Sequence, residues 1–497
     1  MSKDYFGSTA AGEDLHRQSL RSGAVSMLAQ GANMVVQFLS AIVLARLLLP
    51  EDFGLVAMVA AITGFASIFV DLGTRDALSQ RESITEGEVS ALFWINSGVG
   101  LVLTVMAMIC SPLIARFYGE PRLVYITLAM ALTFVLPSLY YAQYAIMRRA
   151  LKFRQLAMVE VGANLLATLV TVVFAYETHS YWALVAKPVL KELFTAISVW
   201  ATCGWHPGRP TFTPGVRDML KFGINILGFA VTDYVAKSAD RVALGYTTGP
   251  RDLGYYQNAL VIYDNPLALF TLSLHGVAVA TLTKLRGNLE SFRRAWTTAL
   301  SSLVFFAAPA FAILAVTAQD LVIVLLGGKW AHAGLLLTVM ALRGPAHVVE
   351  RTIGWLHVAA GRTDRWRRWG FVSCGVFLAA LGCGLPFGVI GVVVSYTAFT
   401  YVVFVPAILY AGRALGISAR HLFTAVGPQL IVALATAGVG LSLRYTVAAG
   451  LSPFTRLVML TVVCGGLYLA VTVRLLRITQ PIQLAVSLLG LRRESAK

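Results

Sequence analysis

The chain consists of a long series of apolar runs of about 20 residues, separated by short polar breaks. A run of this length is what an α-helix needs to cross the hydrocarbon core of a bilayer. Hydrophobic residues make up 57% of the 497 residues and charged residues only 13%, whereas globular domains carry about a quarter charged residues. Strand-like alternation is scarce, which disfavours a β-barrel. The sequence therefore predicts an all-α polytopic membrane protein.

Hydropathy windows predict about 14 transmembrane helices. The predicted spans are 21–45, 53–74, 90–114, 122–147, 156–177, 181–202, 218–244, 253–281, 295–317, 333–356, 368–387, 390–411, 421–443 and 456–476. A proline-rich polar stretch between the sixth and seventh spans has the composition of a linker. The predicted domains are an N-terminal tail (1–19), an N-terminal lobe of six helices (20–202), a linker (203–217), a C-terminal lobe of six helices (218–411), two further helices (412–477) and an amphipathic tail (478–497).

The distribution of basic residues predicts the orientation. If the N-terminus is cytoplasmic, most of the 40 Lys and Arg residues fall in cytoplasmic segments, as the positive-inside rule requires. An even number of spans then places both termini in the cytoplasm. The first 19 residues show no apolar run followed by a cleavage site, so the first span is expected to direct insertion. The net charge of +16 is thus a topology signal that also attracts anionic membrane lipids, and no nucleic-acid partner is expected.

The first and seventh predicted spans are copies of each other. Leu20–Leu55 aligns without a gap with Leu220–Tyr255, and the matches include a glycine early in the span and a Pro-x-Asp-x-Gly turn after it. Because the first lobe has six spans, an even number, both lobes start from the same side of the membrane, which predicts a parallel repeat about an axis along the membrane normal. Such repeats place a substrate site between the lobes and alternate access by rocking.

Five phrases along the chain carry a family resemblance. They are LARLLLPEDFGLVAM (44–58), FVDLGTRDALSQ (69–80), RRALKFRQLA (148–157), DRVALGYTTGPRDLGYYQNA (240–259) and LGGKWAHAG (326–334). In these the chain resembles the polysaccharide-export flippases of the multidrug/oligosaccharidyl-lipid/polysaccharide superfamily, especially the WzxC-like branch. The resemblance implies a fourteen-helix transporter that moves an undecaprenyl-diphosphate-linked oligosaccharide to the periplasmic leaflet of the bacterial cytoplasmic membrane. It also implies polysaccharide polymerase and export machinery as partners.

A lipid diphosphate with a sugar chain requires cations for the phosphates and amides or hydroxyls for the sugars. The first span carries a stripe of amides, Gln30, Asn33 and Gln37, on one helical face. At the same register the seventh span carries Asp233 and Lys237. This coincidence favours two stripes that face a shared central cavity. The alternative is that the amides join neighbouring helices and that the two charges pair with each other.

Two further groups of cations are candidates for substrate binding. Lys187 and Lys191 lie one turn apart on the sixth span, where they either receive the diphosphate or extend towards the lipid headgroups. The tenth span carries Arg343, His347 and Arg351 at successive turns, with Glu350 beside them. That group either lines the cavity or forms a structural ion pair between Glu350 and a nearby arginine.

Two carboxylates are candidates for coupling to an H⁺ or Na⁺ gradient. Glu160 lies near the start of a predicted helix and Asp264 precedes Asn265-Pro266, where a helix break would expose backbone carbonyls. Asp71, and Asp240 with Arg241, are interpreted as helix-end anchors. No cofactor is expected, and the five cysteines lack metal-binding spacing.

The sequence disfavours an enzyme. The phrase LGGKW lacks the spacing and the Ser or Thr of a phosphate-binding loop, and no hydrolase motif is present. A polysaccharide polymerase or ligase is the enzyme alternative. Such enzymes are expected to have a long periplasmic loop, and the predicted spans leave no such loop here. The transport alternative is an exporter of drugs or of another lipid-linked precursor within the same superfamily, whose multidrug members usually have twelve spans.

Overall fold

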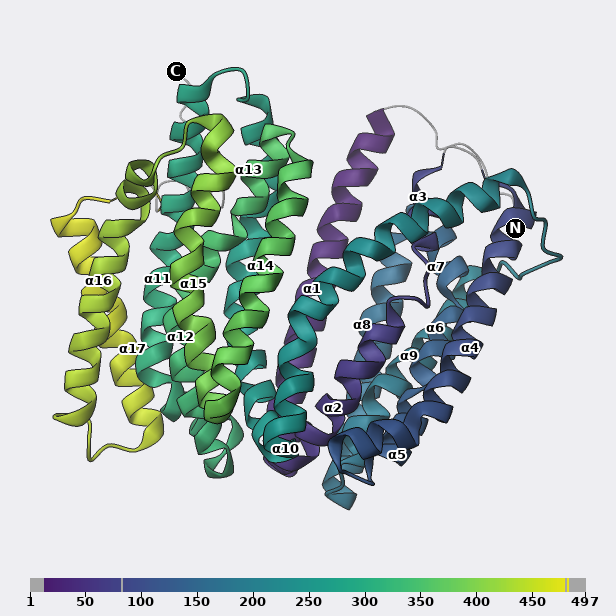
Figure 1. The fold of residues 1–497 in the computed structure, drawn as a ribbon, viewed down its shortest axis with the longest axis horizontal. Coiled ribbons are helices and arrows are strands. Elements are labelled where there is room, and N and C mark those ends of the chain that lie inside the picture. Colours follow the sequence, from purple (N-terminus) through teal and green to yellow (C-terminus); the bar gives the residue numbers. More distant parts are fainter. Residues whose placement is uncertain (1–12, 82–83, 479–480, 482–497) are drawn as a thin grey trace. The chain divides into compact units, whose positions relative to one another are not determined.

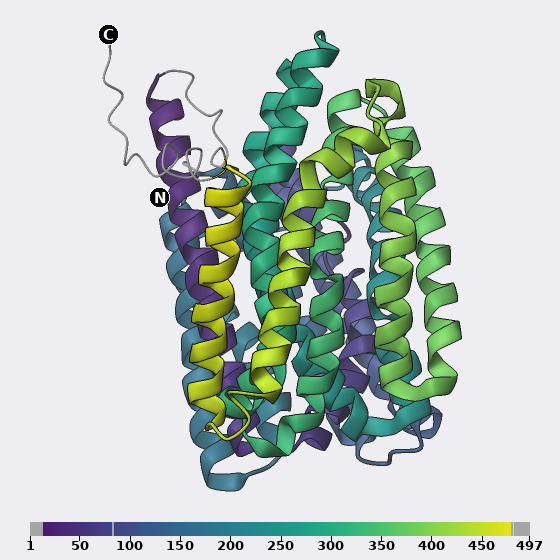
Figure 2. The same cartoon turned by 90° about the vertical axis from the view of Figure 1, so that its left-hand side faces the viewer.

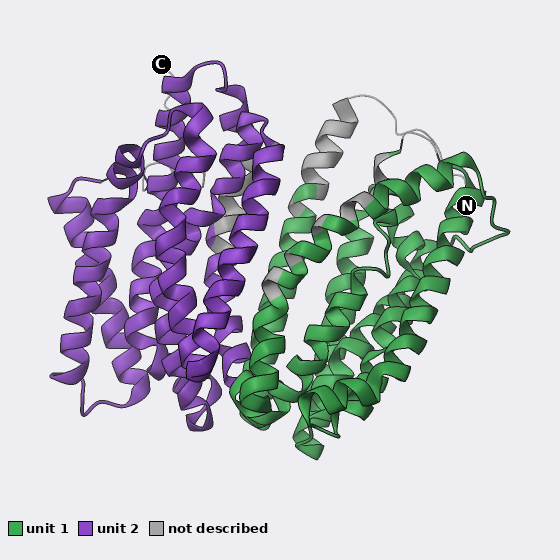
Figure 3. Cartoon of the chain, in the orientation of Figure 1, with its two compact units in different colours: residues 1–254 green, residues 255–497 purple. Residues whose placement is uncertain are grey.

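The computed structural model describes residues 13–81, 84–478 and 481. Within these ranges all regular secondary structure is helical and no strand occurs (Figure 1). The prediction of an all-α protein is therefore confirmed. The chain divides into two compact units, residues 1–254 and 255–497 (Figure 3).

Unit 1 contains the first nine helices and the beginning of the tenth. They are α1 (Glu13–Leu47), α2 (Pro50–Ser67), α3 (Thr74–Gln80), α4 (Glu86–Tyr118), α5 (Leu123–Met130), α6 (Leu132–Ser138), α7 (Tyr141–Arg149), α8 (Phe153–Thr178), α9 (Trp182–Cys203) and α10 (Pro214–Lys284). A non-helical segment, 204–213, precedes α10. The unit boundary falls at Gly254 within α10, so the helix of the seventh predicted span belongs to unit 1. The lobe boundaries expected from the repeat stay a prediction.

Unit 2 contains the rest of α10 and seven further helices. They are α11 (Leu289–Leu326), α12 (Ala331–Arg351), α13 (Ile353–Ala360), α14 (Thr363–Gly384), α15 (Gly388–Gly412), α16 (Ala419–Tyr445) and α17 (Pro453–Leu469). The long helix α11 packs against α12, α16 and α17 (Figures 1 and 2). The predicted amphipathic tail lies almost entirely outside the described residues.

Eight helical segments of the described chain are long and apolar enough to cross a membrane. Their outer surfaces match that role: on α4 the large apolar side chains of Val102, Ile109 and Leu113 are all more than half exposed. A water-soluble monomer rarely shows such a continuous apolar surface. The chain is thus a multi-pass membrane protein, and the total of about 14 spans stays a prediction.

The structure corrects one predicted span and shows interruptions within another. The span expected at 53–74 ends as α2 at Ser67, and the chain then turns at Leu72 (φ 48°) and Gly73 (φ 67°) before α3 begins. The span expected at 122–147 corresponds to the apolar segment Leu123–Arg149, which is long enough to cross a membrane. Its helix is interrupted between α5, α6 and α7, and Pro137, which has no backbone N–H, lies in the last turn of α6. Hydropathy windows locate apolar runs, but these breaks depend on single backbone torsions.

The duplicated Pro-x-Asp-x-Gly turn has a structural reason. Each copy starts a helix with proline at its first position: α2 starts at Pro50, and α10 restarts at Pro250 after a break at Gly249 (φ 83°). In the first copy the Asp52 carboxylate accepts a hydrogen bond of 2.8 Å from the Leu49 N–H, which satisfies a free donor at the helix start.

The two copies of the turn also pack against each other within unit 1. A Cβ atom on Gly54 would collide with the backbone carbonyl of Pro250, and a Cβ on Gly254 would collide with that of Pro50. The contact is therefore reciprocal, and glycine is required on both sides of it. We call this pair of glycine-to-carbonyl contacts the glycine crossing.

A buried ion cluster attaches the last two helices to α11. Asp320, which is 1% exposed, pairs with Arg444 of α16 at 2.7 Å and with Arg456 of α17 at 3.1 Å. Arg444 also donates a hydrogen bond of 2.6 Å to the Val316 carbonyl. Asp320 lies just beyond the predicted span 295–317, so a count of charges within spans did not identify it.

Substitution of either glycine in the glycine crossing is expected to destabilise the protein. Gly54→Ala or Gly254→Ala introduces a methyl group where a carbonyl already lies, at a cost of about 1–3 kcal/mol. The melting temperature of the purified protein in detergent should fall for both variants. Gly98→Ala on α4 is the matched control, because a Cβ there meets no described atom within 4 Å. Unchanged melting of both crossing variants would contradict the contact.

Removal of the Asp320 carboxylate should have a larger effect. Asp320→Ala leaves the buried Arg444 guanidinium without its counter-charge, and the loss of one partner of a buried pair costs about 3–5 kcal/mol. The expected result is a lower melting temperature and faster proteolysis at α16 and α17. Glu290→Ala serves as control, because Glu290 pairs with Arg294 on the exposed surface of α11. Equal melting of the two variants would show that the cluster does not hold these helices.

Candidate functional site

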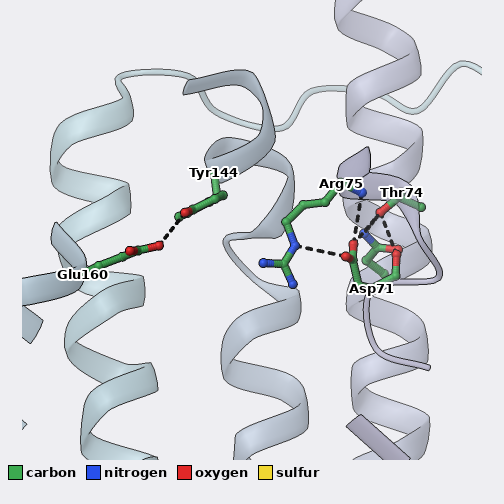
Figure 4. Close-up of polar contacts among 6 residues, drawn as sticks. Asp71, Thr74, Arg75, Tyr144 and Glu160 are labelled. Carbon is green, nitrogen blue, oxygen red and sulfur yellow. Dashed lines mark hydrogen bonds and ion pairs between the residues drawn. The ribbon is translucent and has the colours of Figure 1, made fainter. Parts of the chain in front are cut away.

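A polar network in unit 1 is centred on Asp71, in the turn between α2 and α3 (Figure 4). Its carboxylate accepts hydrogen bonds of 3.1 Å from the Thr74 hydroxyl and from the backbone N–H of Arg75, and one of 3.0 Å from Arg75 Nε. Asp71 therefore anchors the start of α3 and neutralises Arg75, whereas the sequence placed this anchor at the inner end of the second span.

Arg75 lies against two aromatic rings of α7. Its guanidinium carbon is 3.9 Å from the centroid of the Tyr141 ring and 5.8 Å from that of Tyr144. Burial acts to lower the pKa of Arg75, but the Asp71 carboxylate and the neighbouring tyrosines outweigh it, so the pKa is raised. The side chain is thus a permanent cation that pairs with a carboxylate and lies against aromatic rings.

The network extends to Glu160, one of the two predicted coupling carboxylates. The Tyr144 hydroxyl donates a hydrogen bond to Glu160 on α8, and in Figure 4 Tyr144 lies between Glu160 and Arg75. On the other side the Asn96 amide of α4 donates to the Thr74 hydroxyl at 2.8 Å. Four elements, the turn with α3, α4, α7 and α8, are joined through these groups.

The three amides of the stripe on α1 differ in their surroundings. Asn33 accepts a hydrogen bond of 3.0 Å from Asn164 of α8, which is the helix-joining role given above as the alternative. Gln30 and Gln37 are exposed on α1, so they suit a wet surface better than lipid. The side chains of Asp233 and Lys237 lie outside the described residues, and the proposed match between the two stripes stays a prediction.

Lys187 and Lys191 of α9 have different surroundings. Lys187 Nζ donates a hydrogen bond to the Ser40 hydroxyl of α1. Lys191 Nζ lies 3.4 Å from the Glu192 carboxylate and its side chain is 48% exposed. Glu192 also accepts a hydrogen bond of 2.6 Å from Tyr140. Lys187 therefore joins α9 to α1, whereas Lys191 is the more accessible cation.

Unit 2 holds Arg343 near the middle of α12. The guanidinium carbon is 4.9 Å from the ring centroid of Tyr263 on α10 and 5.9 Å from that of Tyr396 on α15. The Tyr263 hydroxyl shares a hydrogen bond of 2.9 Å with His347 Nδ1, one turn after Arg343. The structure thus brings together Arg343 and His347, which the sequence predicted, and adds two tyrosines. We call Tyr263, Arg343, His347 and Tyr396 the Arg343 box.

The ion pair between Glu350 and an arginine, one of the two alternatives for this group, is not found in the described part of the chain. In the described part of the chain neither Arg343 nor Arg351 lies within ion-pair distance of a carboxylate, and the buried Nε of Arg343 has no hydrogen-bond partner there. Arg351 is exposed. A cation in the centre of a span costs about 2.5–3.5 kcal/mol, and a cation–π contact returns roughly 0.5–2 kcal/mol. The contacts with the aromatic rings therefore offset only part of the free-energy cost of placing the Arg343 charge within the span.

The helix break that was expected beside Asp264 is not found, and the coupling role of Asp264 stays a prediction. The helix from Pro250 to Lys284 continues through Asn265 and Pro266, and the break lies at Gly249 instead. The Asn265 side chain donates a hydrogen bond of 2.8 Å to the Val261 carbonyl, and Asp264 is exposed rather than buried. A cation site beside Asp264 therefore no longer has the support of a discontinuous helix.

No sequence pattern described above singles out Arg75, Tyr141, Tyr144 or Tyr263. Arg75 follows the second predicted span, where a basic residue is expected from the positive-inside rule. Its spacing of four residues from Asp71 is the pattern of a local ion pair, which could have identified it. The tyrosines lie within aromatic-rich helices, and sequence spacing does not distinguish a tyrosine at a site from one in the core.

Comparison with known proteins identifies the family. The model of the family described as "Polysaccharide biosynthesis protein" matches residues 43–334, more than half of the chain. The chain belongs to this family. This confirms the resemblance found in the sequence.

Curated relatives share between 22% and 26% of the aligned sequence with this chain. The chain is 26% identical to the teichuronic acid biosynthesis protein TuaB of Bacillus subtilis, over 61% of this chain and 63% of TuaB. It is 25% identical to the lipopolysaccharide biosynthesis protein WzxC of Escherichia coli, over 71% and 73% of the two chains. With the succinoglycan biosynthesis transport protein ExoT of Rhizobium meliloti the identity is 22%, over 64% of each.

Two solved structures show the fold. The lipid II flippase MurJ in an inward closed conformation superposes with a TM-score of 0.72 at 14% identity, covering 91% of this chain and 99% of MurJ. An inward-facing multidrug resistance transporter of the MATE family and MOP superfamily gives a TM-score of 0.57, also at 14% identity, covering 79% and 100%. The family member thus has the helical fold of these transporters.

The cation–π contact in unit 1 is testable by a double-mutant cycle. Tyr141→Leu removes the ring under Arg75, and Arg75→Met removes the cation. The coupling energy between the two changes should be about 0.5–2 kcal/mol. Tyr141→Phe keeps the ring face and should leave most of the coupling. Additive effects of Tyr141→Leu and Arg75→Met on thermal unfolding would show that the two side chains do not interact.

Proposed function

We propose that this protein is a flippase that moves undecaprenyl-diphosphate-linked oligosaccharide repeat units across the bacterial cytoplasmic membrane. The observation that carries the proposal is that a polysaccharide biosynthesis family member shares its fold over 91% of its length with a protein described as a lipid II flippase. The names of TuaB, WzxC and ExoT each refer to the biosynthesis of a polysaccharide or lipopolysaccharide.

The structure contains the kind of polar groups that transport of such a substrate requires. The lipid tail can remain in the bilayer, but the diphosphate and the sugars must pass the hydrocarbon region, which requires polar groups inside the protein. Each unit supplies such groups beneath an apolar exterior: the Asp71–Arg75 network in unit 1 and the Arg343 box in unit 2. Alternating access between two repeated lobes is the transport mode that we propose.

The proposal includes the topology predicted by the basic residues. Both termini then lie in the cytoplasm, α3 with Arg75 lies near the cytoplasmic surface, and the glycine crossing lies near the periplasmic surface. Polysaccharide polymerase and export machinery are the proposed partners that take over the flipped repeat unit.

The driving force is proposed to be an H⁺ or Na⁺ gradient. Glu160 is the better-supported coupling group, because it is half-buried and accepts a hydrogen bond from Tyr144 beside Arg75. The helix break that was the reason to propose Asp264 as a coupling group is not present in the structure. The second candidate function is drug export, which the fold of the MATE transporter favours at its lower TM-score of 0.57.

Deletion of the gene in its source bacterium tests the proposed function. We expect loss of surface polysaccharide and accumulation of repeat units on undecaprenyl diphosphate at the cytoplasmic face, because synthesis continues without transfer. Wild-type protein should restore export, and a stably expressed Lys237→Ala should not if the paired stripes face the substrate. Repeat units that reach the outer face of the deletion strain and stay unpolymerised would contradict the flippase and favour a polymerase.

A further inference from the structure

The arginines of the described chain differ in how their charge is compensated. Arg75 pairs with Asp71 at 3.0 Å, and Arg444 and Arg456 both pair with Asp320. Arg343 has no such partner among the described residues and lies against aromatic rings instead. A guanidinium with unused ion-pairing capacity inside a membrane bundle is a site for an anion.

The groups around Arg343 are held in place by their own contacts. His347 stacks on Tyr263, with ring centroids 6.0 Å apart and an interplanar angle of 21°, and shares the hydrogen bond of its Nδ1 with the Tyr263 hydroxyl. Tyr396 stacks on Phe377 with a centroid distance of 4.3 Å. Rings fixed in this way hold the guanidinium in one orientation. The guanidinium therefore loses little conformational entropy when a ligand binds.

The charges that act on the box are mixed. Asp264 and Glu350 attract Arg343 electrostatically, and Arg351, two turns along α12, adds a second positive charge. Asp264 and Arg351 are exposed, whereas Arg343 and Glu350 are half-buried. A planar guanidinium with a second arginine nearby favours an anion with several oxygens over a single carboxylate.

We propose that the Arg343 box of unit 2 is a phosphate-anion site that takes the diphosphate of the lipid-linked substrate. The proposal rests on the proposed function for the identity of that anion. The same chemistry would also accept the phosphate of an ordinary membrane lipid, so the test must separate the two sources. Arg343 supplies the bidentate donor, and Tyr263 and His347 are positioning residues that fix its orientation.

The test measures binding to the purified full-length protein in phosphatidylcholine nanodiscs. The probe is undecaprenyl diphosphate, compared with undecaprenyl monophosphate, and affinity is read by native mass spectrometry. We expect Arg343→Gln to weaken diphosphate binding by at least about tenfold, because a charge-assisted hydrogen-bond pair is lost. Arg294→Gln, an exposed arginine of α11 in the same unit, should bind as the wild type does.

A second variant protects the test against misfolding. Arg343→Lys keeps the charge and loses the planar fork, so it should weaken diphosphate binding by about threefold or more and leave monophosphate binding nearly unchanged. The melting temperature of each variant establishes that it is folded. If Arg343→Gln does not fold, the result with Arg343→Lys decides.

Two results would overturn the proposal. Folded Arg343 variants that bind undecaprenyl diphosphate as tightly as the wild type would show that the box is structural. Equal competition by phosphatidylglycerol in the nanodisc would assign the site to membrane lipid. Failure of the proposed function can be distinguished from failure of the site. Diphosphate binding that depends on Arg343, together with normal export in the deletion strain, would support the anion site and contradict the flippase function.

Discussion

A charged side chain inside a membrane bundle must find compensation, and this constraint accounts for most of the polar structure described above. In unit 1 Asp71 both starts α3 and neutralises Arg75, while Tyr141 provides a face for the guanidinium. In unit 2 Asp320 uses the same pairing to attach α16 and α17 to α11. Arg343 departs from the pattern, since its guanidinium lies against the rings of Tyr263 and Tyr396 and no described carboxylate lies within ion-pair distance of it.

Much of the fold follows from the sequence because a bilayer allows few solutions. Apolar runs of about 20 residues can hardly form anything but helices, and the copied Pro-x-Asp-x-Gly turn indicated a repeat before any coordinates. The structure gives the turn its reason, since Gly54 and Gly254 each accommodate the other copy's backbone. The interruptions at Leu72 and between α5 and α6 were not predictable, because they depend on local torsions within runs that remain apolar.

The candidate site was less predictable than the fold. The helical spacing of Arg343 and His347 correctly indicated a shared face, but Tyr263 and Tyr396 come from other helices that only tertiary packing brings near. Asn33 and Glu160 were selected as polar residues within spans, and their partners Asn164 and Tyr144 emerged only from the helix packing. Arg75 was missed because a basic residue near a span end already has a sufficient explanation in the topology.

The function proposed for this protein is the transfer of a lipid diphosphate with its sugars between leaflets. Transfer can be measured in liposomes that contain the purified protein and a fluorescent undecaprenyl-diphosphate oligosaccharide, with an impermeant quencher that reports the lipid exposed in the outer leaflet. We expect faster quenching than in protein-free liposomes, with no acceleration for undecaprenyl phosphate, which lacks the diphosphate and the sugars. An equal rate with and without correctly inserted protein, with and without an imposed H⁺ or Na⁺ gradient, would contradict this function.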